Sequence, residues 1–145
     1  MIALVQRVTQ AKVEVEQQVV GQIRHGLVVL LGVQKHDDQT LADKLLKKVL
    51  SYRIFNDNDD KMNLSLLDIE GELLVVSQFT LAAETKKGLR PGFSTAATPA
   101  QAQELYQHFV SQSKTYGLDT QTGSFGADMQ VSLTNDGPVT FSLTV

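Results

Sequence analysis

The first part of the chain alternates apolar and polar residues in a pattern that predicts strands. A first strand is expected over residues 1–8, and Val13 and Val15 then alternate with charged side chains, which indicates a half-exposed strand. A short strand is expected at residues 19–23. Residues 27–31 form an unbroken apolar run between two glycines, and such a run is typical of a strand that is buried on both faces.

The spacing of apolar residues changes to that of a helix over residues 38–53. Leu41, Leu45, Val49 and Tyr52 fall on one face of this helix, and the lysines lie largely outside that face. The pattern therefore predicts a helix that packs one side against a core.

The second half of the chain predicts more strands and one further helix. Strands are expected at residues 64–69 and 72–81, and a loop that contains glycine and proline follows at residues 82–98. A helix is expected to begin at Pro99, which suits the first helical position, with Thr98 as its N-cap. Three closing strands are expected at residues 118–122, 127–134 and 138–145.

The order of these elements indicates the class of fold. Groups of strands separated by single helices argue against a doubly wound parallel sheet, in which strands and helices alternate regularly. We predict an α+β fold: a mostly antiparallel sheet, or an open β-barrel, with two helices packed on it. The length of 145 residues fits a single domain over residues 1–145.

The composition excludes several classes of protein. The chain has no cysteine, which excludes a disulfide scaffold, a thiolate zinc site, an iron–sulfur cluster and a cysteine nucleophile. No apolar run approaches the roughly 20 residues that span a bilayer, and no signal-peptide pattern is present, so we expect a soluble, cytoplasmic protein. The net charge of −3 does not attract nucleic acid over long range, so binding of RNA would need a local basic patch.

Neither the acidic residues nor the histidines suggest a metal site. Residues 56–60 are closely spaced Asn and Asp, but the glycine and glutamate that an EF-hand loop requires are missing from its spacing. His25, His36 and His108 lack the i, i+4 spacing of a helical metal pair. We therefore expect a solvated turn at residues 56–60, and neither a metal nor a cofactor.

Lys86, Lys87 and Arg90 crowd a loop that also contains glycine and proline. By charge alone this is a solvated loop. The alternative is a contact with the phosphates of a nucleic acid, because a flexible basic loop can follow such a backbone.

Two other stretches combine unusual residues. Ser77, Gln78, Phe79 and Thr80 end an apolar strand; in a strand, alternate side chains of this run face opposite ways, and polar groups at the rim of a sheet often form a site. At residues 135–140 an Asp-Gly pair indicates a hairpin turn, but the proline that follows it removes a backbone donor. Taken singly, the two stretches are explained by a half-exposed strand and a turn.

Taken together, these stretches resemble the two defining motifs of the D-aminoacyl-tRNA deacylase family. The motifs are SQFTL at residues 77–81 and NDGPVT at residues 135–140. The segments KMN at 61–63, GLRPGF at 88–93 and GSFGADM at 123–129 resemble further segments of the family. The resemblance covers essentially the whole chain.

The resemblance implies hydrolysis of the ester that joins a D-amino acid, and also glycine, to the 3′ end of tRNA. It implies a homodimer without cofactor, metal or membrane contact, which rejects L-amino acids. By match of motif, the implied catalytic pocket consists of Ser77, Gln78, Phe79 and Thr80. The residues implied in substrate binding and chiral selection are Phe125, Met129, Gly137 and Pro138, the last two as a Gly-cisPro pair that reaches into the partner's pocket. The implied tRNA contacts are Lys86, Lys87 and Arg90.

Two mechanisms stay open for such a site. Thr80 as the nucleophile needs a base within hydrogen-bond reach, and neither motif contains a histidine. We favour attack by water assisted by the 2′-hydroxyl of the tRNA, with backbone N–H groups around residues 78–80 as the oxyanion hole.

Two other functions also stay open. One is an RNA-binding module without catalysis, which the basic loop favours and the acidic net charge opposes. The other is an accessory dimer whose motifs have drifted. Hydrolysis of an aminoacyl ester by the purified protein separates the deacylase from both.

Overall fold

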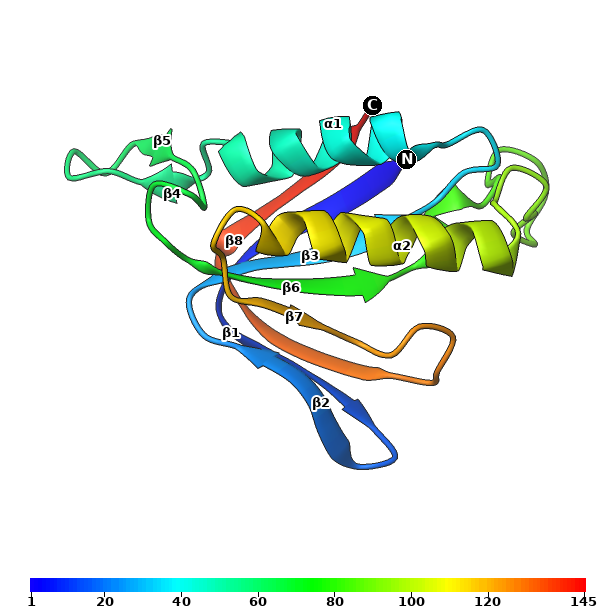
Figure 1. Cartoon of the computed structure of the whole chain (residues 1–145), viewed down its shortest axis with the longest axis horizontal. Coiled ribbons are helices and arrows are strands. Elements are labelled where there is room, and N and C mark those ends of the chain that lie inside the picture. Colours follow the sequence, from blue (N-terminus) through cyan, green and yellow to red (C-terminus); the bar gives the residue numbers. More distant parts are fainter.

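The computed structural model describes residues Met1–Val145, and Figure 1 shows two helices lying over a strongly curved sheet. The elements in chain order are β1 (Ile2–Val15), β2 (Gln18–Ile23), β3 (Gly26–Gly32), α1 (Gln39–Ser51), β4 (Phe55–Asn56), β5 (Met62–Leu64), β6 (Glu72–Ser77), the 3₁₀-helix η1 (Phe79–Ala82), α2 (Pro99–Lys114), β7 (Thr120–Thr122) and β8 (Gln130–Thr144). Neither α-helix combines the length and the apolar character needed to cross a bilayer.

The long strand β1 organises the sheet, because three other strands pair with it. Its first part pairs antiparallel with β3 and its second part with β2, while β8 runs antiparallel along its opposite edge. The sheet continues from β3 to β6 and from β6 to β7 through parallel pairings. Antiparallel pairing dominates, as predicted, but the sheet is mixed.

The sheet curls until β2 approaches β7, which makes it an open, barrel-like structure. Gly21 of β2 lies so close to β7 that a Cβ atom there would be 2.1 Å from the carbonyl oxygen of Thr122. Only glycine permits this approach of two backbones. The predicted open barrel with two helices is therefore confirmed.

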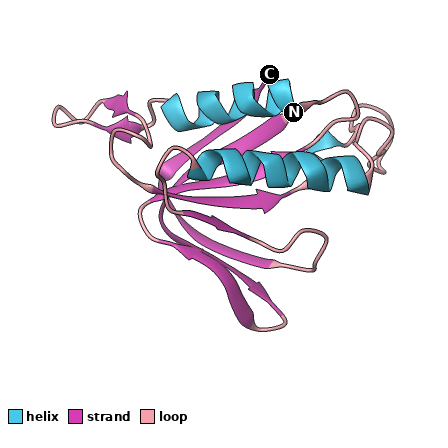
Figure 2. Ribbon diagram, viewed as in Figure 1, coloured by secondary structure: helices cyan, strands magenta, loops and turns pink.

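Both helices cover one face of the sheet (Figure 2). Each begins with a capped first turn: Asp38 accepts a hydrogen bond from the Leu41 N–H, and Thr98 accepts one from the Gln101 N–H. Along β3, alternate residues enter the main core under the helices and a smaller core on the inner side of the curled sheet. This double burial explains the unbroken apolar run at residues 27–31.

Two predicted strands differ from the structure, one at its end and the other over nearly its whole length. The strand expected over residues 72–81 ends at Ser77, and η1 follows it. The strand expected at residues 64–69 is a turn, in which Asp68 Oδ2 accepts hydrogen bonds from the backbone and hydroxyl groups of Ser65. Both segments contain apolar residues at strand spacing, but short-range hydrogen bonds turn the chain.

The last two predicted strands, at residues 127–134 and 138–145, form the single strand β8. β8 stays paired with β1 on both sides of an irregularity: Val8 pairs with Asn135, and Gln6 pairs with Thr140. Residues 136–139 therefore bulge opposite Arg7 instead of forming a hairpin turn.

Candidate active site

A pocket of about 460 Å³ opens where β3 and β6 end, beside the first turns of α2. Its walls are mainly apolar. They consist of Leu31, Val33, Val76, Ser77, Gln78, Phe79, Ala97, Pro99, Ala102, Tyr106, Phe125, Gly126, Ala127, Met129 and Val131. The structure therefore brings together five of the predicted site residues, from segments that are far apart in the sequence.

The turn from β6 into η1 presents backbone donors beside this pocket. The Gln78 N–H donates to the Leu31 carbonyl oxygen at 2.8 Å, so the parallel pairing with β3 continues to this residue. The N–H groups of Phe79 and Thr80 come next, and neither has an acceptor within the protein, as expected for the first residues of a helix. Of the backbone donors expected around residues 78–80, that of Gln78 is therefore already occupied, and those of Phe79 and Thr80 are free.

Thr80 lies at the exposed rim and not among the lining residues. Its hydroxyl oxygen accepts a hydrogen bond from Gln78 Nε2 at 2.5 Å, and no carboxylate or imidazole is bonded to it. The predicted alternation of residues 77–80 is wrong, because Gln78 and Phe79 both line the pocket. The 3₁₀ turn, which the sequence pattern does not reveal, produces this difference.

Tyr106 of α2 is the only titratable residue that lines the pocket, and the sequence patterns do not single it out. Its hydroxyl donates to the carbonyl oxygen of Val75 at 2.8 Å, and its ring packs against Phe125 with centroids 5.7 Å apart. Burial raises the pKa of Tyr106 to about 12. The pocket therefore contains no side chain that ionises near neutral pH.

The segment before α2 forms the outer wall of the pocket and is fastened to the exit of β3. The Ala97 N–H donates to the Val33 carbonyl oxygen, and Gln34 bridges to Ala96. The turn at Gln34 is held in place by Asp37, whose carboxylate accepts the Gln34 N–H and pairs with the buried ammonium of Met1, each at 2.7 Å. The hydrogen bonds of a buried carboxylate thus support the pocket wall.

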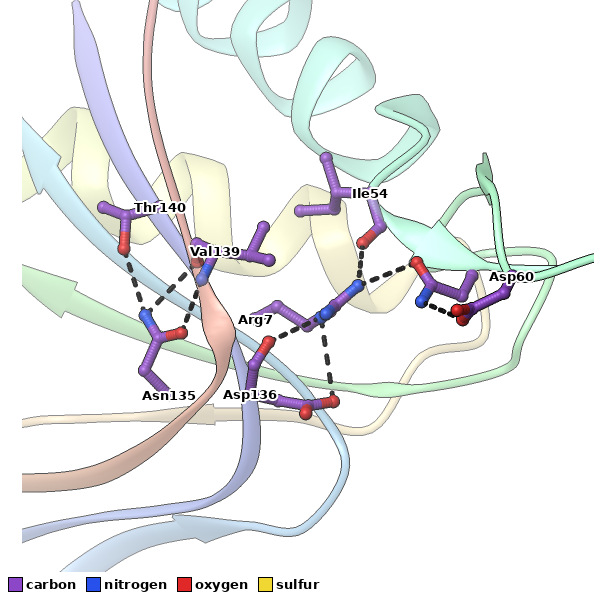
Figure 3. Close-up of polar contacts among 8 residues, drawn as sticks. Arg7, Ile54, Asp60, Asn135, Asp136, Val139 and Thr140 are labelled. Carbon is purple, nitrogen blue, oxygen red and sulfur yellow. Dashed lines mark hydrogen bonds and ion pairs between the residues drawn. The ribbon is translucent and has the colours of Figure 1, made fainter.

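Gly137 and Pro138 are exposed on the bulge of β8 and do not line the pocket of their own chain. The peptide bond between them is cis. Figure 3 shows how Arg7 fastens the bulge: its Nε donates to the Asp136 carbonyl oxygen at 2.9 Å, and its Nη1 donates to the Ile54 carbonyl oxygen at 2.8 Å. Arg7 therefore ties the bulge to the segment between α1 and β4.

The sequence matches one family of enzymes over nearly its whole length. A sequence profile described as D-Tyr-tRNA(Tyr) deacylase matches residues 4–144. The chain belongs to this family. It is 67% identical to a D-aminoacyl-tRNA deacylase of Pseudoalteromonas translucida (strain TAC 125) and 62% identical to one of Haemophilus influenzae (strain ATCC 51907 / DSM 11121 / KW20 / Rd), and both alignments cover 100% of each chain. The predicted family and the predicted class of enzyme are confirmed.

Two solved structures share the deacylase fold described above. The c-Myc DNA unwinding element binding protein superposes with a TM-score of 0.94 at 40% sequence identity, over 100% of this chain and 99% of that chain. A probable eukaryotic D-amino acid tRNA deacylase superposes with a TM-score of 0.87 at 17% identity, over 99% and 98% of the two chains. The second likeness supports the fold alone.

In this deacylase chain the basic residues Lys86, Lys87 and Arg90 lie on an exposed loop, and none of them forms an ion pair within the chain. Glu84 and Gly92 close the base of the loop through two backbone hydrogen bonds of 2.7 and 3.0 Å. Phe93, the next residue, packs against Phe79 with ring centroids 5.1 Å apart. The loop is therefore joined to the rim of the pocket.

Proposed function

We propose that the protein hydrolyses the ester bond of D-aminoacyl-tRNA and releases free D-amino acid and tRNA. Membership of the deacylase family supports this reaction. The observation that carries the proposal is the pocket beside η1, where an apolar cavity without an ionisable base adjoins two unoccupied backbone N–H groups. Such a site suits an ester that is already activated and needs positioning more than proton transfer by the protein.

In the proposed reaction, water attacks the carbonyl carbon of the ester while the 2′-hydroxyl of the terminal ribose relays the proton. The bond from the carbonyl carbon to the ribose 3′ oxygen breaks, and that oxygen takes the proton. The N–H groups of Phe79 and Thr80 stabilise the negative charge on the carbonyl oxygen, and one such donor contributes roughly 3–4 kcal/mol. The absence of a carboxylate or imidazole bonded to Thr80 supports water rather than Thr80 as the nucleophile.

We further propose that Gly137 and Pro138 select the chirality of the substrate in the pocket of a second copy of the chain. Their exposure and their position outside their own pocket support action in trans, and a two-fold dimer would supply the contact twice. Backbone held rigidly at the pocket would collide with an L side chain and leave a D side chain free. Glycine has no side chain to exclude, so glycyl-tRNA would also be hydrolysed.

The tRNA itself would be held by the basic loop. Lys86, Lys87 and Arg90 are exposed and form no ion pair within the chain, and lysine and arginine side chains are common ligands of backbone phosphates. A tRNA substrate also suggests that the protein acts in the cytoplasm.

Hydrolysis of matched D-tyrosyl-tRNA and L-tyrosyl-tRNA by the purified protein tests this function. We expect rapid release of D-tyrosine and little release of L-tyrosine. The main alternative is binding of nucleic acid without catalysis, which the DNA-binding name of one structural relative favours. Tight binding of both tRNAs without hydrolysis of either would support that alternative and overturn the deacylase.

A further inference from the structure

The bulge that carries Gly137 and Pro138 has lost the ladder hydrogen bonds that normally fix a strand. Val8 pairs with Asn135 and Gln6 pairs with Thr140, so residues 136–139 stand opposite Arg7 alone. A bulge of this kind re-aims the chain but leaves its extra residues unpaired. The path of the bulge must therefore be fixed by side chains.

The side chain of Asn135 crosses the base of the bulge and fastens its far side. Its Oδ1 accepts a hydrogen bond from the Val139 N–H at 2.6 Å, and its Nδ2 donates to the Val139 carbonyl oxygen at 3.2 Å and to Thr140 Oγ1 at 3.0 Å (Figure 3). The amide of Asn135 thus uses both its acceptor and its donor group to close a ring around residues 136–138.

The identity of the bonded atoms explains why this contact determines the path of the bulge. Pro138 has no N–H, so the N–H of Val139 is the first backbone donor after the Gly-Pro pair, and Asn135 binds it directly. Arg7 holds the near side of the bulge through the Asp136 carbonyl oxygen. Gly137 and Pro138 are therefore suspended between two fixed points.

Asparagine suits this position because a single short side chain must accept one hydrogen bond and donate others. Aspartate accepts but cannot donate, so it would keep the bond from the Val139 N–H and place a negative charge beside the Val139 carbonyl oxygen. Alanine would lose every bond.

We propose that Asn135 is a positioning residue for stereochemical selection, which holds the Gly137–Pro138 bulge rigid enough to exclude L-aminoacyl groups. The inference rests on the proposed function, because it assumes that the bulge acts as the obstacle in a partner's pocket. An obstacle that can move no longer discriminates. Weakening the Asn135 bonds should therefore change the ratio of D to L hydrolysis, which a residue that only stabilises β8 would not do.

The test compares Asn135→Ala, Asn135→Asp and Thr140→Val with the parent protein. Rates on D-tyrosyl-tRNA and L-tyrosyl-tRNA are measured together with the urea midpoint and the sedimentation coefficient. We expect Asn135→Ala to lower the ratio of D to L hydrolysis by roughly tenfold, since it removes all the bonds across the bulge, and Asn135→Asp to lower it by less. Thr140→Val removes the outermost of the Asn135 bonds and a 3.5 Å hydrogen bond from Gln6 Nε2. It keeps both bonds to Val139 and should keep the parent's ratio.

A folded, dimeric Asn135→Ala protein with the parent's ratio would overturn the proposal. If Asn135→Ala does not fold, Asn135→Asp decides in the same way, and failure of both to fold would assign Asn135 to the stability of β8 alone. The parent protein distinguishes failure of the proposed function from failure of the proposed role of Asn135. A parent that does not distinguish D from L overturns the proposed function, whereas a discriminating parent with unaltered variants overturns only the role of Asn135.

Discussion

The pocket beside η1 and the Gly137–Pro138 bulge depend on side chains of opposite character, apolar in the pocket and polar around the bulge. The pocket is lined mainly by apolar side chains from strand ends and α2, and its one titratable lining residue, Tyr106, is held in its neutral form. The bulge is exposed, and polar side chains, Arg7 and Asn135, hold it. A pocket binds a ligand through its shape, whereas an exposed segment that excludes part of a ligand must be held rigidly. The contrast supports our proposal that one region receives a ligand and the other acts on something outside its own chain.

The largest expected effect comes from breaking the bulge while leaving the pocket intact. At Gly137 the φ angle is +149°, and a Cβ atom would lie 2.6 Å from Val139 Cγ2 and 3.0 Å from the Val139 nitrogen. Gly137→Ala must therefore displace the bulge, and misplacement by about 1 Å costs on the order of 100-fold in rate. We expect a loss of this size with D-tyrosyl-tRNA and no gain with L-tyrosyl-tRNA.

The matched control for this substitution is Gly117→Ala, at the end of α2. Gly117 also has a positive φ angle, of +78°, but a Cβ atom there would meet nothing within 4 Å. Gly117→Ala should cost some stability and keep the parent's rate. Equal rates in the two variants would show that the bulge plays no part in the reaction.

The second largest effect is expected for substitutions in the basic loop, which should weaken tRNA binding without affecting the pocket or the bulge. Changing Lys86, Lys87 and Arg90 together to Glu should raise the KM for D-tyrosyl-tRNA by tens of fold. It should also flatten the dependence of KM on salt, because each lost phosphate contact reduces the slope by about 1. Hydrolysis of a short D-aminoacyl-adenosine ester, which lacks the phosphates of tRNA, should stay unchanged. An unaltered salt slope would mean that the loop is only a solvated surface.

The sequence predicts the pocket better than it predicts the turn and the bulge. Apolar patterns identify α1 and the buried strand β3, because burial requires apolar side chains, and the capping residues Thr98 and Pro99 identify the start of α2. The turn into η1 begins after Gln78, whose N–H makes the last backbone hydrogen bond to β3, at Leu31. The spacing of hydrophobic residues does not indicate this position. The contacts of Arg7 with Ile54 and Asp136 join distant segments, so only the folded chain reveals them. The motif of residues 135–140 contains Asn135, but its spacing predicts a hairpin turn instead of a bulge.

Pro138→Ala should have an intermediate effect, confined to chiral selection. The proline ring fixes φ and limits the conformations of the bulge, while the bonds of Asn135 and Arg7 remain. We expect the ratio of D to L hydrolysis to fall by about tenfold, since the flexibility that proline suppresses is regained in part. Sedimentation must show that the variant keeps the parent's oligomeric state. A variant with the parent's ratio would show that Pro138 has only a structural role in the bulge.

Substitutions in the pocket and at its rim should have smaller effects than those in the bulge. Thr80→Ala removes a hydroxyl that is bonded only to Gln78 Nε2 and leaves the Thr80 N–H in place. If water is the nucleophile, the rate should fall by no more than about tenfold, whereas loss of an essential nucleophile costs several orders of magnitude. Mass spectrometry of a quenched reaction should find no acyl group on Thr80. Detection of an acyl-enzyme at this residue would contradict the mechanism.

The smallest effect on catalysis is expected for Tyr106→Phe, which keeps the ring and removes the hydroxyl that donates to the Val75 carbonyl oxygen. Its effect should appear in the pH dependence of stability. The pKa of Tyr106 is about 12 in the folded protein against an ordinary value of 10. Between these values the unfolded chain has lost the phenolic proton and the folded chain keeps it, so stability falls as pH rises.

The stability advantage of the parent over Tyr106→Phe should therefore vanish and reverse in sign between pH 10 and pH 12, because a pKa difference of two units corresponds to about 3 kcal/mol. At neutral pH the parent should be more stable by about 1 kcal/mol, the net contribution of one hydrogen bond. Urea unfolding of both proteins at several pH values measures this, and the comparison cancels the other tyrosines and the lysines. Hydrolysis near neutral pH should stay within about twofold of the parent's, well below the roughly 100-fold loss that removal of an oxyanion donor causes. A much larger loss would show that the hydroxyl touches the reacting ester and that the pocket contributes more than shape.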